Sequence, residues 1–155
     1  MHPARARRNP SPLTCPSLLS RAQKPESGIA PAPKTTERYL VQTALNWTAS
    51  ELHAASGPLF NPALSAEVKA FCTDRLKAKY QTLNDLLLKG GKKFLVGDAF
   101  TIADSYCYIV CSWSGYLGLD LAVYPNVKAY FDGIAALPNV KAAHAAMAGE
   151  PKTVC

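Results

Sequence analysis

The chain has 155 residues, 48% of them hydrophobic, which is a one-domain length with enough apolar content for a sizeable core. Its net charge of +6 is unevenly distributed along the chain. Residues 1–34 carry six Arg and Lys residues and one acidic residue, Glu26, so most of the positive charge lies in the amino-terminal segment. A membrane or signal-peptide class is excluded, since the most apolar stretch, Ile102–Leu117, is interrupted by Asp104 and three serines.

We expect residues 1–28 to form a disordered, basic, proline-rich tail, because residues 1–34 hold seven of the twelve prolines and no periodic apolar pattern. Two interpretations stay open for this tail. An Arg-rich, acid-poor start is compatible with an organelle transit peptide. A non-native or mis-assembled amino terminus without a role is the other. No aromatic residue lies among Arg5, Arg7 and Arg8 and no recognition fold follows, so we predict no nucleic-acid partner.

The first predicted helix of the globular part runs from near Thr35 to about Ala55. Asn46 and His53 are seven residues apart on it, which is nearly two turns, or about 10 Å of rise on one face of an α-helix. Ser50 lies between them, so polar side chains form a stripe along this face. Taken by itself, the stripe is explained by an ordinary solvated helix face.

The second predicted helix begins at Ser65, a residue type that caps helix starts, with Glu67 in its first turn. Apolar residues then follow at helical spacing as far as Leu87. The helix should end near Lys89, because the next two residues are glycines, which act as stop signals.

The central feature of the sequence is a helix start that must form inside a core. In the decapeptide Leu95–Asp104, Thr101 and Asp104 have the spacing of a capping box, in which each side chain meets the backbone N–H of the other residue. The helix from about 101 to 117 is apolar nearly all round, which is typical of a buried helix. Buried N–H groups at its start cannot form hydrogen bonds with water, so the capping side chains must supply the acceptors.

Two short helices, at about 125–136 and 138–147, complete the globular part. Each begins with the phrase Pro-Asn-Val-Lys-Ala, in which proline suits a first helical turn. The thirteen-residue offset between the two phrases is too short for a solenoid repeat. No alternating strand pattern occurs, so the sequence predicts an all-α architecture.

Five scattered cysteines favour a reducing compartment over a disulfide framework. They are Cys15, Cys72, Cys107, Cys111 and Cys155. The pair Cys107 and Cys111 lies four residues apart on the central helix, but no His or further Cys stands at ligand spacing. We therefore predict no metal site and a structural role for this pair as small buried residues.

Two segments resemble one known family. The decapeptide, with a hydrophobic pair, Gly, a polar turn, an aromatic and then Thr-x-Ala-Asp, is similar to the start of the central helix in the carboxy-terminal domain of glutathione S-transferases. Residues 29–60, with Leu45-Asn46-Trp47 and Glu51-Leu52-His53, are similar to the first helix of that domain in the bacterial beta class. The resemblance covers about residues 29–150, which leaves 151–155 as a short carboxy-terminal tail, and implies a five-helix bundle.

The resemblance also implies site residues. Asn46 and His53 match residues that bind glutathione and influence the electrostatics around its sulfur. Trp113 matches a tryptophan that lines the pocket for the hydrophobic electrophile, and Phe60, Tyr106 and Tyr116 are candidates for the same wall. Core packing is the alternative for these aromatic residues. Asp104 matches a structural acid, and no residue here inherits the catalytic role, so His53 is auxiliary at most.

Complete members of the family carry a thioredoxin-like domain of which residues 1–28 show no trace, and a family lysine after the helix-one histidine is replaced by Ala54. We expect an exposed apolar patch near Asn46, His53 and Trp113 where that domain would pack. Two functions stay open. One is the carboxy-terminal half of a cytoplasmic transferase that joins glutathione, its co-substrate, to hydrophobic electrophiles, with a homodimer or a thioredoxin-like partner. The other is a non-catalytic helical module that binds ligands or proteins.

Overall fold

A computed structural model describes residues 28–149, and this part of the chain contains helices and turns but no β-strand. The predicted all-α fold is therefore confirmed. The tail predicted for residues 1–28 lies outside the described residues except for Gly28, and so does the short tail predicted for 151–155.

The first helix is longer than predicted and changes its winding midway. It consists of α2 (Thr36–Trp47), a π-helical turn (Thr48–His53), α3 (Ala54–Ser56) and a 3₁₀ turn (Gly57–Phe60). Thr35 caps its start, since the Thr35 hydroxyl accepts a hydrogen bond from the Arg38 N–H at 3.2 Å. A wide turn in the middle of a helix alters which residues share a face, and this turn lies within the candidate site.

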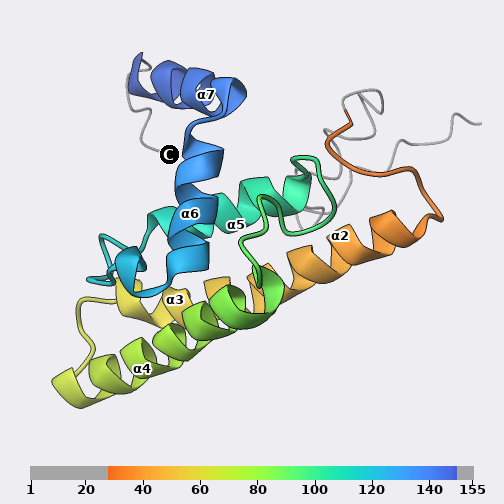
Figure 1. Cartoon of the computed structure of the whole chain (residues 1–155). Helices are drawn as coiled ribbons and strands as arrows, with labels where there is room; N and C mark the ends of the chain where they lie inside the picture. Colours follow the sequence, from red (N-terminus) through yellow and green to blue (C-terminus); the bar gives the residue numbers. More distant parts are fainter. Residues whose placement is uncertain (1–27, 150–155) are drawn as a thin grey trace, which may run out of the picture.

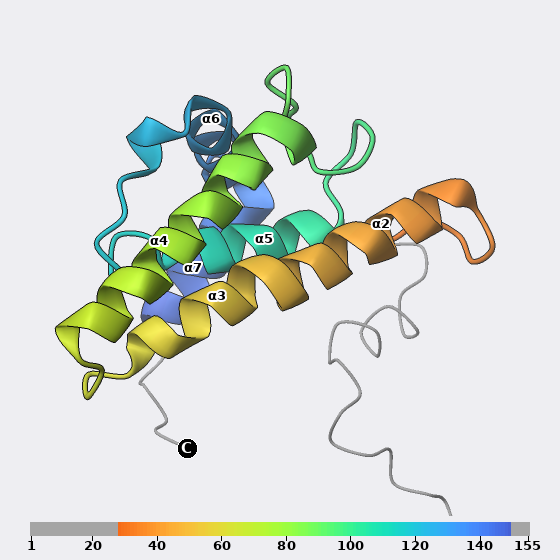
Figure 2. The same cartoon turned by 90° about the horizontal axis from the view of Figure 1, so that it is seen from below.

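The second helix runs as α4 (Ala66–Thr82) and ends in another π-helical turn (Leu83–Leu87). Ser65 caps its start as predicted, with its hydroxyl accepting from the Val68 N–H at 3.3 Å. Gly90 and Gly91 have φ angles of +80° and +73°, the left-handed region that glycine adopts without strain, so the predicted stop is confirmed. Figures 1 and 2 show α4 lying alongside the first helix.

The central helix α5 (Ile102–Ser112) is buried as predicted, but it ends earlier than the predicted boundary at about 117. Beyond Ser112 the chain tightens into turns, in which the Trp113 N–H donates to the Val110 carbonyl three residues back at 3.2 Å. Gly118 has a φ of +73°, a value that no α-helix contains. The break places Trp113 at the end of α5 rather than within it.

The helices form a bundle around α5. α2 and the π-helical turn Thr48–His53 pack on α5, while α6 (Pro125–Ala135) packs on both α5 and the π-helical turn Leu83–Leu87 that follows α4. α7 (Pro138–Gly149) packs on α6 and lies farthest from the pair formed by α2 and α4 in Figure 1. No described helix combines the length and apolar character that a bilayer-spanning helix needs.

A buried carboxylate holds the start of α5. Asp104 has no exposed surface, and its Oδ2 accepts from the Thr101 N–H at 2.8 Å and from the Thr101 hydroxyl at 2.9 Å. Its Oδ1 accepts from the Leu95 N–H at 2.8 Å and from the Tyr130 hydroxyl at 3.1 Å. The predicted capping box is therefore present, and three further donors, the Thr101 hydroxyl, the Leu95 N–H and the Tyr130 hydroxyl, reach the same side chain. Four donors around one carboxylate fill its acceptor positions.

Tyr130 donates to Asp104 as a neutral phenol. Burial, followed by the nearby Cys107 and Asp104, raises the pKa of Tyr130 far above its ordinary value. The hydroxyl thus keeps its proton at neutral pH and donates to the Asp104 carboxylate, which ties α6 to α5.

The segment before α2 also contributes to the start of α5. The Ile102 N–H, one of the first helical N–H groups that lacks a partner within the helix, donates to the Ile29 carbonyl at 2.9 Å. A residue far away in the sequence therefore supplies an acceptor for a buried N–H group at the start of α5.

We expect Asp104→Ala to destabilise the fold by at least about 3 kcal/mol, because the substitution leaves four buried donors without an acceptor. The measurement is the midpoint of urea or thermal unfolding followed by circular dichroism. Asp98→Ala removes an exposed carboxylate from the preceding loop and is the matched control, with a change of less than about 0.5 kcal/mol. Equal melting of Asp104→Ala and the parent chain would show that the carboxylate does not hold the helix start.

The cysteine pair of the central helix lies in the core. Cys107 and Cys111 have no exposed surface, and their Sγ atoms are 4.0 Å apart. The contact with Cys107, together with burial, raises the pKa of the Cys111 thiol well above its ordinary value. Among residues 28–149 no three His, Cys, Asp or Glu side chains come together as metal ligands would.

A raised thiol pKa leaves little thiolate at neutral pH, and thiolate is the reactive form. We therefore expect iodoacetamide to label Cys72, which is partly exposed, much faster than Cys111 in the native protein. Peptide mass spectrometry after timed labelling measures the rate at each cysteine separately. Unfolding in urea should remove the difference, whereas native labelling of Cys111 as fast as Cys72 would contradict the buried arrangement.

Candidate functional site

The π-helical turn determines where His53 points. The Thr48 and Ser50 hydroxyls donate to the carbonyls of Ala44 and Asn46, at 2.9 and 2.8 Å, and such bonds compete with the regular helical ladder. A π-helical turn takes in about one residue more than an α-turn, so it rotates the following residues by roughly 100°. The angle between Asn46 and His53 around the helix axis therefore differs from the one that α-helical spacing predicts.

Asn46 and His53 occur in different surroundings as a result. Asn46 is exposed, and its side chain makes no hydrogen bond within residues 28–149. His53 is half-buried against α5. Within residues 28–149 no hydrogen bond joins Asn46 and His53, and their shared role in glutathione binding stays a prediction.

Two aromatic residues of the central helix meet His53. Tyr106 lies in α5 and Trp113 follows its last turn, seven residues later and so on nearly the same side. The ring centroids of His53 and Tyr106 are 5.8 Å apart, and those of His53 and Trp113 are 5.0 Å apart, both edge to face. The imidazole is therefore flanked by two aromatic rings.

The contacts continue into a series of five rings, which we call the ring ladder: Tyr106, His53, Trp113, Phe60 and Tyr116. Phe60 meets Trp113 edge to face at 5.3 Å and stacks on Tyr116 at 5.5 Å, with an interplanar angle of 16°. All four aromatic residues predicted for the hydrophobic site thus lie in one series with His53. The ladder opens to solvent at one end, since Phe60 is 41% and Tyr116 is 78% exposed.

His53 also makes a polar contact in the ladder. Its Nδ1 is 2.5 Å from the Tyr106 hydroxyl, a short hydrogen bond that sequence reasoning did not predict. The spacing between the residues is 53 positions, so no local pattern could have indicated it. Outside the ladder, Lys79 forms an ion pair with Glu51, which fastens the π-helical turn to α4.

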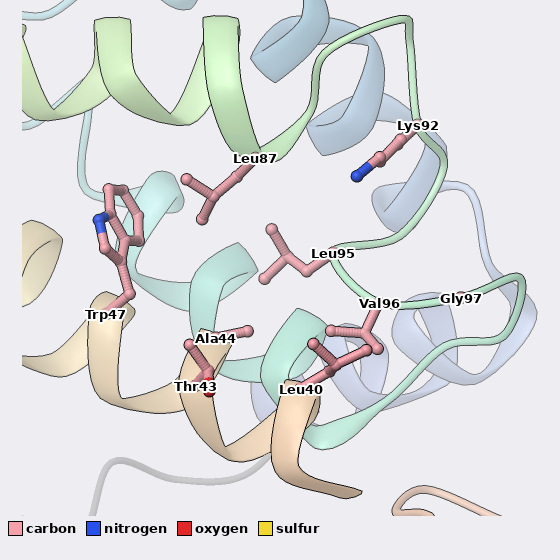
Figure 3. A pocket seen from close by; sticks show the side chains of 9 residues that line it. All are labelled: Leu40, Thr43, Ala44, Trp47, Leu87, Lys92, Leu95, Val96 and Gly97. Atoms are coloured by element: carbon pink, nitrogen blue, oxygen red, sulfur yellow. The ribbon is translucent and has the colours of Figure 1, made fainter. Parts of the chain in front are cut away.

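A concave surface lies nearer the start of the first helix. A groove of about 370 Å³ runs between α2, the π-helical turn Leu83–Leu87 and the loop before α5 (Figure 3). Its apolar lining is Leu40, Ala44, Trp47, Leu87, Leu95 and Val96. Lys92 extends toward it from the loop. Leu40, Ala44 and Trp47 recur at helical spacing, a signal that the sequence analysis did not use.

The comparisons with known proteins agree on one family. Residues 53–146 match the family model described as glutathione S-transferase, C-terminal domain. The chain is 32% identical over 113 residues to glutathione S-transferase GstA of Escherichia coli O157:H7, and the match covers 73% of this chain and 55% of that relative.

Solved structures give the same result. A sphingomonad glutathione S-transferase complexed with glutathione is 38% identical, with a TM-score of 0.79 over 86% of this chain and 66% of that one. The bacterial beta class enzyme of Sphingomonas chungbukensis is 36% identical, with a TM-score of 0.76 over 84% of this chain and 64% of that one. The chain spans about half the length of the curated relative and about two thirds of these structures. A bacterial beta class enzyme is among the similar structures. The matched family model describes the carboxy-terminal domain and covers more than half of the chain. Because the fold agrees as well, the chain belongs to the glutathione S-transferase family.

Proposed function

We propose that this chain supplies the hydrophobic-substrate site and part of the glutathione site of a glutathione S-transferase. In the reaction of the whole protein, the glutathione thiolate attacks an electrophilic carbon of an apolar compound. A carbon–sulfur bond forms and the leaving group departs with the bonding electrons. The observation that carries this proposal is the ring ladder, in which one imidazole stands among aromatic rings that reach the surface.

The outer ladder suits the electrophile. Phe60, Trp113 and Tyr116 offer apolar ring surface at the solvent-exposed end, and a hydrophobic ligand gains free energy by covering it. Ligand sites of this kind combine an apolar lining with few polar groups that orient the ligand. His53, next to Trp113, is the polar group that the ladder provides.

His53 suits the sulfur of glutathione. An imidazole N–H near a thiolate stabilises the anion, and this interaction favours the ionised nucleophile. We assign His53 an auxiliary role and no catalytic residue to this chain. Asn46 would contact glutathione from α2, as an exposed polar group whose side chain makes no hydrogen bond within residues 28–149.

The groove suits a protein partner. Leu40 and Tyr39 on the first helix are 50% and 61% exposed, and such a surface favours cover by another apolar surface. We propose a second copy of the protein or a thioredoxin-like domain as the cover. A reducing, cytoplasmic setting fits the described cysteines, Cys72, Cys107 and Cys111, which are free thiols.

A non-catalytic binding module is the second candidate function. The observation that favours it is the groove itself, since a volume of about 370 Å³ with an apolar lining falls in the range of small-molecule sites. The two candidates differ in the surface used, because the transferase uses the ring ladder and the binding module uses the groove. Trp113 and Trp47 report on the two surfaces separately.

We expect S-hexylglutathione, a glutathione thioether with an apolar chain, to shift the indole N–H resonance of Trp113 more than that of Trp47 in the chain alone. Trp113→Ala should weaken this binding roughly tenfold, the effect of losing about 1.4 kcal/mol of contact. Two-dimensional NMR titration measures both effects, and Trp47→Phe is the matched control with little effect. A response confined to Trp47 would favour the binding module instead.

We expect no measurable turnover of glutathione with an aryl halide by the chain alone. Turnover is therefore measured after fusion to the thioredoxin-like half of the sphingomonad relative. In that fusion His53→Ala should lower kcat/KM roughly tenfold, because the thiolate loses a hydrogen-bond donor. His144→Ala is the control, because this histidine of α7 contacts Tyr108 rather than a ring of the ladder. Unchanged kcat/KM and unchanged glutathione affinity in His53→Ala would remove the assigned role.

A further inference from the structure

Two tyrosines of α5 each hold a histidine of another helix. The Tyr106 hydroxyl lies 2.5 Å from Nδ1 of His53, and the Tyr108 hydroxyl lies 3.0 Å from Nε2 of His144. The two tyrosines are two residues apart on a helix, so they point in different directions. The nitrogen that each tyrosine engages also differs, and this difference determines which nitrogen is left for other partners.

The surroundings of His53 fix its ring orientation as well as its position. The ring meets Tyr106 at an interplanar angle of 71° and Trp113 at 75°. A flip of the imidazole would replace Nδ1 by a carbon atom and break the bond to the Tyr106 hydroxyl. The aromatic contacts therefore limit the plane of the ring, and the hydrogen bond selects one of its two orientations.

The hydrogen bond also links the position of the imidazole proton to the direction in which the Tyr106 hydroxyl bonds. Neutral imidazole has one N–H donor and one acceptor nitrogen, and a phenol hydroxyl can donate or accept. Where the Tyr106 hydroxyl donates to Nδ1, the proton of neutral His53 resides on Nε2, and where it accepts, the proton resides on Nδ1. Within residues 28–149, Nε2 makes no hydrogen bond, so in the first case its N–H is left for a ligand.

We propose that Tyr106 is a positioning residue, whose hydroxyl holds His53 in one orientation and as the Nε2–H tautomer, so that Nε2–H is the donor presented to an anionic ligand atom. Under the proposed function, on which the identity of the ligand rests, that atom is the thiolate sulfur of glutathione. Tyr106 acts only through His53, and its ring remains part of the ladder.

Tyr106→Phe separates this role from simple packing, because the substitution keeps the ring and removes only the hydroxyl. The test records long-range ¹⁵N–¹H correlations of the histidine rings in the full chain at about pH 8, where free imidazole is neutral. In the parent chain His53 should show an acceptor-type Nδ1 and a protonated Nε2. In Tyr106→Phe the Nδ1 resonance should move, the two tautomers should mix and His144 should stay unchanged.

Tyr108→Phe is the matched control on the same helix. It should move the Nε2 resonance of His144 and leave His53 unchanged. Melting of both variants within a few degrees of the parent shows that each is folded. The proposal is overturned if the His53 ring nitrogens are unmoved in Tyr106→Phe, or if Tyr108→Phe moves them as much.

A titration with two ligands tests the positioning role of Tyr106 separately from the proposed function. Glutathione and S-methylglutathione are titrated separately, since only the first offers a thiolate. Tyr106→Phe should reduce the preference for the thiol over the thioether severalfold. If the tautomer is fixed as described but neither compound binds, the positioning role of Tyr106 stands and the proposed function fails. If both compounds bind but His53 shows mixed tautomers in the parent chain, the positioning role fails and the function stands.

Discussion

The structure depends on one buried carboxylate with four donors. Asp104 joins the loop before α5 through Leu95, the first turn of α5 through Thr101, and α6 through Tyr130. A carboxylate buried without a cation is tolerated only where hydrogen bonds replace the lost hydration, and here every acceptor position has a donor. These hydrogen bonds also fix elements that carry surface residues. α5 carries Tyr106 into the ring ladder, while the loop fixed at Leu95 forms one wall of the groove.

The first helix presents two different surfaces. Trp47 faces the groove, and His53 faces α5 and the ring ladder. The two residues are six positions apart, so even an uninterrupted α-helix would hold them about 120° apart around its axis. The π-helical turn Thr48–His53 begins directly after Trp47 and changes this angle, and the ion pair between Glu51 and Lys79 ties the turn to α4.

Signals that act within one or two helical turns could be predicted from the sequence. The Thr101 and Asp104 cap, the Ser65 cap and the stop at Gly90 are all local, and all are present. Contacts between distant residues could not. Asn84 accepts from the Asn126 N–H at 2.9 Å and so caps α6 from another helix, 42 positions away. The Tyr130 bond to Asp104 is of the same kind. The π-helical turn escaped prediction because the spacing was interpreted with the α-helical period.

The ring ladder could be predicted from the sequence only in part. Its residues could be named from the sequence, since a family resemblance pointed to His53 and Trp113, but the order of their contacts could not. That order has a chemical meaning, because the hydrogen bond between Tyr106 and His53 lies at the half-buried end, and the exposed end holds Phe60 and Tyr116. A hydrogen bond is stronger away from water, whereas apolar ring surface is useful to a ligand only where it is accessible. Under the proposed function and the proposed positioning by Tyr106, the ladder offers a donor for a thiolate at its inner end and an apolar surface for an electrophile at its outer end.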